Sequence, residues 1–349
     1  MIDLIIMGGI LLFLLFTLLF GAKYIPAGNN SFFDQYNSKA MRGFWCLIVI
    51  LVHIPQAYQN PIQDMIGRFG YIGVTFFFMT SAYGLSAGIH NKPDSINNFW
   101  RMRLPKLLIP NWTSNLILAL LFFVIFGQRS SFGSYFVINI WVKWLLACYA
   151  AFWLVYYFNQ SKKHSALLVS ILVIMLSISI YYLKLTGNVN STTWCTESIG
   201  FVWGMLLFSW YDKIKQFFSR KWITKASVAC LLSLILGVSY LQFKHVIFWG
   251  DYILKIVLGL SILCFILVLN STIKIGNRIS WFLGDISFEI YLIHGAVFQL
   301  IQRTLPNIRS GMFILLSITL TVLIASVIHR TGNILQKYYI SFIKRQIHS

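Results

Sequence analysis

Charged residues, and acidic residues above all, are scarce in this chain. Only 11% of its 349 residues are charged, and Asp and Glu together number 9. Soluble globular proteins carry about 25% charged residues, so this composition excludes a water-soluble domain. An apolar fraction of 58% with 17% aromatic residues excludes a disordered chain as well.

Clustered metal ligands and paired cysteines are also missing. The 5 cysteines lie far apart, and the sequence has no CxxC pair and no Cys/His cluster. We therefore expect neither a metal site nor a disulfide framework. The net charge of +19 would indicate nucleic acid in a soluble chain. In so apolar a chain it indicates membrane topology instead, because cytoplasmic loops of membrane proteins collect Lys and Arg.

The sequence contains many long apolar runs. A helix needs about 20 mainly apolar residues to cross a bilayer, and the sequence predicts about eleven such spans. The predicted fold is an all-α, polytopic membrane helix bundle. The first run has no basic residue before it, which favours a retained helix over a cleaved signal peptide. The spans are predicted at residues 3–20, 42–58, 70–88, 107–127, 137–158, 165–184, 197–210, 226–243, 252–270, 284–302 and 311–329.

Loop charge predicts the orientation of the bundle. Of the 28 Lys and Arg residues, 20 lie in the loops that follow the odd-numbered spans or in the C-terminal tail, counting Arg42 at the end of its span. The positive-inside rule places that side in the cytoplasm. The N-terminus is then outside and the C-terminus cytoplasmic.

Ionisable residues inside spans are costly, so each is a candidate functional group. His53 and Arg42 are eleven residues apart in the second span, which is about three helical turns, so they share one face. A guanidinium grips phosphate bidentately, and an imidazole handles protons near neutral pH. The pair suits a long ligand with an anionic head and a reactive tip. The alternative is a core histidine beside an ordinary positive-inside arginine.

A basic cluster lies in the predicted loop between the third and fourth spans, on the same side of the membrane as Arg42. Arg101, Arg103 and Lys106 stand within six residues of one another. The cluster is either a phosphate clamp or a topological signal beside anionic lipid headgroups.

The tenth predicted span carries several polar residues. Asp285 and Glu289 are four residues apart and are expected to share a face, as are Ser287 and His294, which are seven apart. Glu289 is interpreted either as a proton carrier or as a structural partner of Lys143 or Lys255.

Four segments of the sequence stand out together: the Arg-to-His helix Ser38–His53, the phenylalanine-rich Gly70–Leu85, the basic entry ending in Lys106–Pro110, and the Tyr-Leu-x-His run within Ser287–His294. In this order they resemble acyltransferase family 3, the integral-membrane O-acyltransferases of bacterial surface glycans. Ala82 stands where the family usually has glycine, and Lys106 where arginine is common.

The resemblance implies a fold and an activity. Residues 38–349 would form the family's ten-helix membrane domain, and residues 1–37 an extra N-terminal transmembrane helix and cytoplasmic linker. The activity would move an acyl group from cytoplasmic acyl-CoA, usually acetyl-CoA, to a hydroxyl of a surface polysaccharide or its lipid-linked precursor. The protein would lie in the bacterial cytoplasmic membrane.

The resemblance also assigns roles to residues. His53 would be the general base or a transient acyl carrier, with Glu289 and His294 completing the catalytic site. The residues expected to hold the phosphates of CoA are Arg42, Arg101, Arg103 and Lys106, and those expected to contact the acceptor are Ser81, Tyr83 and Glu197.

A membrane transporter or flippase is the alternative function. Transporters often contain two halves with matching interrupted helices, which this sequence does not show. A coupling site also tends to contain more than one buried carboxylate. The clear candidates in this sequence cluster on one predicted helix. We therefore favour an enzyme.

Overall fold

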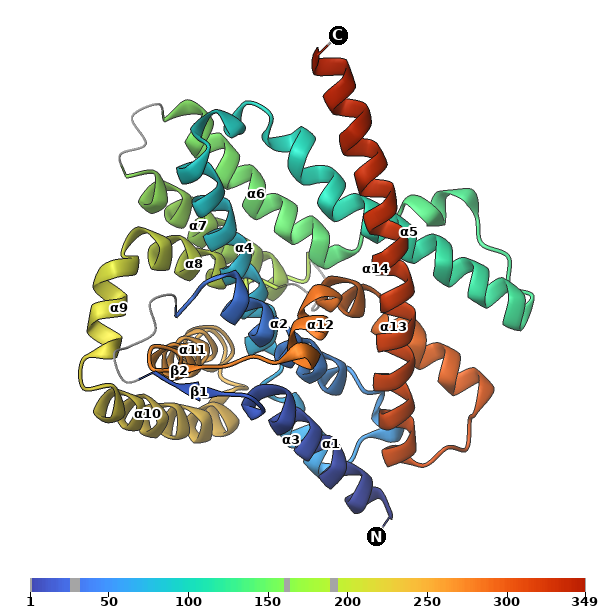
Figure 1. The fold of residues 1–349 in the computed structure, drawn as a ribbon. Coiled ribbons are helices and arrows are strands. Elements are labelled where there is room, and N and C mark those ends of the chain that lie inside the picture. The colour runs from blue at the N-terminus through green and yellow to red at the C-terminus, as the bar shows by residue number, and fades with distance from the viewer. Residues whose placement is uncertain (1, 26–31, 160–163, 189–193, 349) are drawn as a thin grey trace.

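The computed structural model describes residues 2–25, 32–159, 164–188 and 194–348. They form a helical bundle, which confirms the predicted all-α membrane fold; two short strands, β1 (Lys23–Tyr24) and β2 (Ile273–Lys274), pair antiparallel (Figure 1). The helices are α1 (Ile2–Leu19), α2 (Gln35–Val52), α3 (Pro61–Gly67), α4 (Tyr71–Asn91), α5 (Phe99–Phe126), α6 (Ile140–Phe158), α7 (Ser165–Leu185), α8 (Ile199–Ser209), α9 (Tyr211–Ser219), α10 (Trp222–Phe243), α11 (Lys255–Asn270), α12 (Arg278–Asp285), α13 (Ser287–Thr304) and α14 (Ser310–His348).

Seven helical segments among the described residues are long and apolar enough to cross a membrane, and two shorter apolar helices accompany them. The predicted spans 42–58 and 284–302 are not among these, because α2 is more polar and the other span is broken. The total of eleven spans and the orientation therefore stay predictions.

Hydrogen-bonding side chains cap the starts of α2 and α12. The Asp34 side chain accepts the N–H of Asn37 at the start of α2, and the Asn277 side chain accepts two N–H groups at the start of α12. Such caps satisfy the free donors of the first helical turn. They fix where α2 and α12 begin, and hence the positions of the side chains along them.

The prediction that a helix continues past His53 to residue 58 is wrong. α2 ends at Val52, and His53 is its C-cap residue. Pro55 lies two residues further on; it has no N–H to donate and disfavours helical backbone in the residue before it. His53 therefore lies at the end of a helix, where its side chain is exposed.

The prediction of one continuous helix over residues 284–302 is also wrong. α12 ends at Asp285, and α13 begins at Ser287 after the single linking residue Ile286. Asp285 and Glu289 consequently lie on separate helices and do not share a face. Asp285 pairs with Lys39 of α2, with 2.6 Å between Nζ and Oδ1.

The predicted basic loop is helical. α5 begins at Phe99, so Arg101, Arg103 and Lys106 all lie in its first turns. The consequence is a fixed spacing of the three cations around one helix rather than a mobile loop.

Two glycines set the closest approach of α2 to α12. A Cβ on Gly43 would overlap the carbonyl oxygen of Ser280, and a Cβ on Gly284 would overlap that of Lys39. Backbone atoms cannot turn aside as a side-chain end can, so only glycine permits this crossing. The crossing places Arg42, the neighbour of Gly43, close to the α12–α13 junction.

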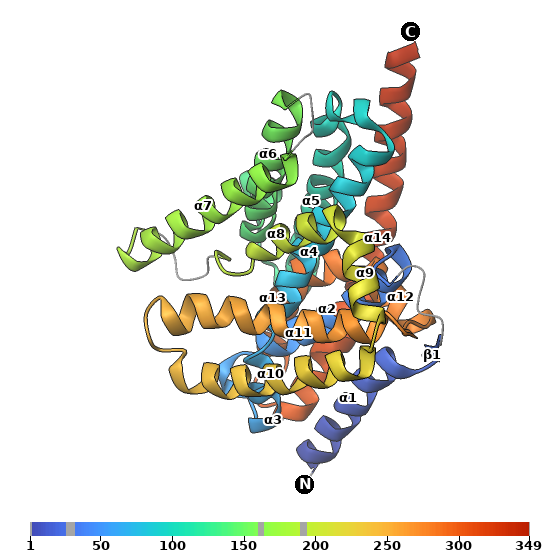
Figure 2. The same cartoon turned by 90° about the vertical axis from the view of Figure 1, so that its left-hand side faces the viewer.

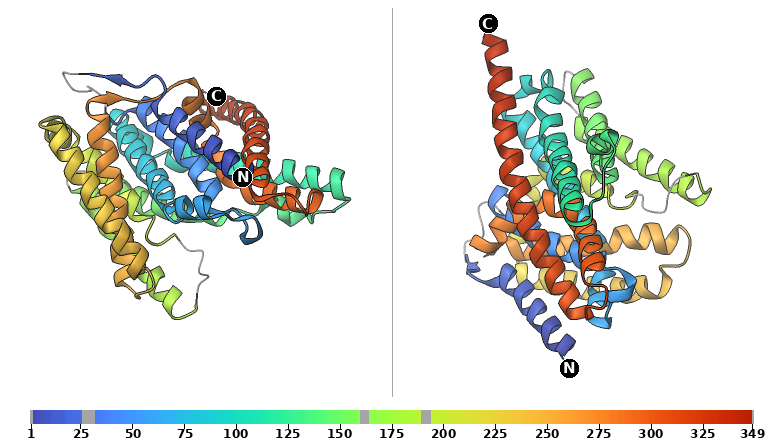
Figure 3. Two further views of the ribbon diagram at one scale, coloured as in Figure 1. Left: turned by 90° about the horizontal axis from the view of Figure 1, so that it is seen from below. Right: turned by 90° about the vertical axis from the view of Figure 1, so that its right-hand side faces the viewer.

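The remaining helices surround this crossing. α10 and α11 lie side by side along one face (Figure 2), and α14 runs the length of the molecule (Figure 3). α1 is fixed at both ends. Its Asp3 carboxylate accepts the Gly311 N–H at the start of α14, and its last carbonyls accept hydrogen bonds from the Asn277 side chain.

Replacing Gly43 tests the crossing. Gly43→Ala should lower the free energy of unfolding by about 1–3 kcal/mol, the usual cost of overpacking. The control Gly84→Ala, in α4, has nothing within 4 Å of its new Cβ and should be neutral or stabilising. Thermal unfolding in detergent measures both. Equal midpoints for the two variants would contradict a tight α2–α12 contact.

Candidate active site

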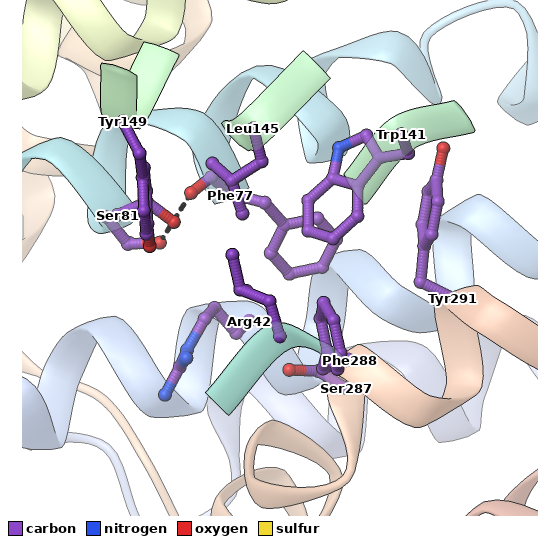
Figure 4. A pocket seen from close by; sticks show the side chains of 11 residues that line it. Arg42, Phe77, Ser81, Trp141, Leu145, Tyr149, Ser287, Phe288 and Tyr291 are labelled. Carbon is purple, nitrogen blue, oxygen red and sulfur yellow. Dashed lines mark hydrogen bonds between the residues drawn. The ribbon is translucent and has the colours of Figure 1, made fainter. Parts of the chain in front are cut away.

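A small cavity lies where α2, α4, α5, α6 and α13 meet (Figure 4). Its volume is about 200 Å³. That is below the roughly 300–1,000 Å³ of pockets that hold a whole drug-sized ligand. Its polar lining comes from Arg42, Thr80, Ser81, Tyr149, Ser287 and Tyr291.

Arg42 lines this cavity without an ion-pair partner among the described residues. Its Nε is buried and has no hydrogen-bond acceptor. A buried donor without an acceptor costs about 1–3 kcal/mol, and more when it is charged. The guanidinium is therefore suited to an anionic ligand.

Tyr149 of α6 lies between two cations. Its hydroxyl is hydrogen bonded to the Ser81 side chain, and both Arg42 and Arg103 are close enough to act on it electrostatically. Arg103 itself packs over Gly88 of α4, where a Cβ would lie 3.0 Å from its guanidinium. The structure thus brings Arg42, Ser81 and Arg103 together around Tyr149, while Arg101 and Lys106 are exposed on α5.

The two predicted catalytic histidines are in contact. The ring centroids of His53 and His294 lie 4.8 Å apart, although the residues come from α2 and α13. His294 is buried, with 8% of its surface exposed, whereas His53 is exposed. A ligand that approaches from outside the bundle can therefore reach the ring of His53.

Hydrogen bonds to the backbone orient both rings. His53 Nδ1 lies 2.9 Å from the Val49 carbonyl oxygen, and His294 Nδ1 lies 3.2 Å from that of Ile290. A carbonyl oxygen only accepts, so each Nδ1 carries a hydrogen, and in the neutral imidazole Nε2 is then the unprotonated nitrogen. Each Nε2 then keeps its lone pair, as a base or nucleophile requires.

Tyr291 connects the cavity to the histidine pair. It lines the cavity, and its ring centroid lies 4.7 Å from that of Trp141 and 5.7 Å from that of His294. Neither histidine lines the cavity itself. Arg42 and His53 are thus linked by the ring contacts of Tyr291 with His294 and of His294 with His53.

Comparison with known families identifies the family of the chain. The acyltransferase domain of family 3 matches residues 32–330, most of the chain. The chain belongs to acyltransferase family 3. No curated protein and no solved structure matches it at a significant level. The family match decides between the two predicted functions, and with the apolar helices it makes the protein a multi-pass membrane acyltransferase.

Glu289 of this acyltransferase has a partner that the sequence analysis missed. Its Oε1 lies 2.9 Å from His329 Nδ1, and the other ring nitrogen of His329 contacts Asn333. Glu289 is 4% exposed and close enough to act electrostatically on Arg42. Neither Lys143 nor Lys255 pairs with it. The partner was not predictable because His329 follows 40 residues later, on a helix whose orientation a single sequence does not give.

Two predicted substrate-binding residues of the acyltransferase lie outside the cavity. Tyr83 packs into an aromatic cluster, with ring centroids 4.9 Å from Phe33 and 6.1 Å from Tyr211. Glu197 is buried and forms an ion pair with Lys255, with 2.7 Å between Oε1 and Nζ. The structure gives both residues packing and pairing partners in place of a ligand.

Breaking the Glu197–Lys255 pair should destabilise the acyltransferase. Removing one partner of a buried pair costs about 3–5 kcal/mol, because the other charge stays buried. Lys255→Met should show this loss in thermal unfolding, and Glu197→Gln/Lys255→Met should recover part of it. Lys143→Met, at an exposed lysine, is the matched control and should change stability by no more than about 0.5 kcal/mol. Additive losses in the double variant would contradict the pairing.

Proposed function

We propose that this acyltransferase moves a short acyl group, acetyl, from cytoplasmic acyl-CoA to a hydroxyl of a cell-surface polysaccharide or its lipid-linked precursor. The supporting observation is the His53–His294 pair next to a cavity lined by an unpaired guanidinium. We place the enzyme in the bacterial cytoplasmic membrane, where donor and acceptor are on opposite sides.

The basic residues around the cavity fit the anionic end of the donor. Arg42 and Arg103 both lie near Tyr149. Each guanidinium can bind a phosphate through two parallel N–H donors. Arg101 and Lys106, exposed at the start of α5, would contribute to the same phosphates from outside. Glu289, paired with His329 behind Arg42, is a positioning residue in this proposal.

The cavity size favours a small acyl group. A volume of about 200 Å³ leaves no room for a long acyl chain to pass toward Tyr291 and His53. The polar side chains of Ser81 and Ser287 line the cavity and would contact the donor on this path.

Two routes of transfer fit the histidine pair. In the first, His53 Nε2 takes the proton of the acceptor hydroxyl while the hydroxyl oxygen attacks the thioester carbon; the C–O bond forms, the C–S bond breaks, and the proton passes to the CoA thiolate. In the second, His53 Nε2 attacks the thioester and releases CoA. The acceptor oxygen then displaces the imidazole, and His294 Nε2 accepts the hydroxyl proton.

His53→Ala should abolish transfer while the protein still folds. Loss of a positioned base costs about 10²–10⁴-fold in rate, and the exposed position of His53 allows the substitution without a buried gap. The measurement is transfer of radiolabelled acetyl groups from acetyl-CoA to membrane glycan. His90→Ala, at another exposed histidine, is the matched control and should keep full activity. Wild-type transfer by the His53 variant would rule out its catalytic role.

Arg42→Ala should weaken donor binding. Hydrogen bonds to charged groups contribute about 1.5–3 kcal/mol, so the KM for acetyl-CoA should rise roughly 10- to 150-fold. Arg42→Lys keeps the charge without the bidentate geometry, so its KM should lie between those of the wild type and Arg42→Ala. Arg309→Ala, in an exposed loop, is the control. A lower kcat with an unchanged KM would show that Arg42 does not hold the donor.

A further inference from the structure

A long apolar groove lies away from the cavity, on the surface formed by α1, α12 and α14. α1 and α14 meet near Asp3 and Gly311 and diverge toward α12 (Figure 3). The groove between them has a volume of about 570 Å³, and its lining is almost wholly apolar. Gly9 of α1 faces it, and a Cβ there would meet nothing within 4 Å.

The groove continues into a basic pocket. The pocket has a volume of about 690 Å³ and shares Phe282 and Leu323 with the groove. Its polar lining includes His329, Arg330 and Lys337 of α14. One surface therefore offers an apolar section followed by a cationic one, as an amphipathic anion requires.

The two cations of this pocket are free to bind. Neither Arg330 nor Lys337 forms an ion pair within the described part of the chain. The nearby carboxylates are already engaged, since Asp285 pairs with Lys39 and Glu289 with His329. The local charge is thus positive and uncompensated.

We infer that this groove binds one anionic phospholipid, with an acyl chain between α1 and α14 and its phosphate on Arg330 and Lys337. The position of the cations agrees. The apolar lining on α14 runs from Leu315 to Leu323, within the predicted span 311–329, and Arg330 follows directly at the end of that span.

The predicted orientation agrees as well. Arg330 and Lys337 lie on the part of α14 that leads to the C-terminus, which the loop charges place in the cytoplasm. The cytoplasmic leaflet is the one with anionic lipids, and juxtamembrane cations are attracted to it. The inference does not rest on the acyl transfer proposed above, because the groove is separate from the cavity around Arg42.

A substitution that fills the groove tests the apolar section. Full-length protein in nonionic detergent is titrated with phosphatidylglycerol, and bound lipid is counted by native mass spectrometry. Wild type should retain one phosphatidylglycerol, and Gly9→Leu should retain none. The matched control is Gly8→Leu, one residue earlier in α1, whose new Cβ also meets nothing within 4 Å but does not face the groove. Equal lipid binding by the two glycine variants would overturn the inference.

Substitutions in the basic pocket test the headgroup section. Arg330→Gln/Lys337→Gln should weaken phosphatidylglycerol binding roughly 30-fold, which at 1.4 kcal/mol per factor of ten corresponds to about 1 kcal/mol for each basic side chain. Lys213→Gln, an exposed lysine on α9, should have no effect. Phosphatidylcholine with the same chains should bind more weakly than phosphatidylglycerol and be insensitive to the double variant.

Two further results would contradict a lipid site. Equal affinity for phosphatidylcholine and phosphatidylglycerol would show that the cations do not read the headgroup. Displacement of phosphatidylglycerol by millimolar inorganic phosphate would show a site for soluble phosphate. Thermal unfolding of each variant, expected to match wild type, separates lost binding from lost folding.

Discussion

The contact between His53 and His294 is the interaction on which the functional site depends. It joins the end of α2 to the middle of α13, and it holds two imidazoles with their free nitrogens available beside a cavity lined by Arg42. At the other end of α2, Gly43 and Gly284 allow a close crossing with α12. A larger residue at either glycine would separate the helices and move Arg42 away from Tyr149.

The ionisable groups inside the bundle differ in their partners. Glu197 pairs with Lys255, and Oε1 of Glu289 contacts His329, while its Oε2 is buried without a partner in the described part of the chain. Among the same residues Arg42 has no ion-pair partner, and its buried Nε has no acceptor. An enzyme that binds an anionic donor gains from this arrangement, because the cost of the unpaired cation is recovered when the ligand binds. Stability and function thus rest on different side chains of similar chemistry.

Much of the fold was predictable from the sequence, because apolar runs of bilayer length have few other structures available. Spacing and the family resemblance selected Arg42 and His53 as candidates, and the resemblance added His294; their roles stay predictions. The break at Ile286 and the pairing of Glu289 with His329 were not predictable, since both depend on how distant helices pack. Ser81 and Tyr83 are a further case in which the packing had to be known. They are two residues apart and therefore point about 200° apart around α4. Ser81 lines the cavity, whereas Tyr83 packs into an aromatic cluster.

A structure with a non-hydrolysable acyl-CoA analogue bound tests the central claim most directly. The account predicts that the phosphates contact Arg42 and Arg103, and that the acyl carbon passes Tyr291 to lie within about 3–3.5 Å of His53 Nε2, the distance of a reactive encounter. An analogue whose acyl end stays on the far side of Trp141, away from both histidine rings, would contradict it.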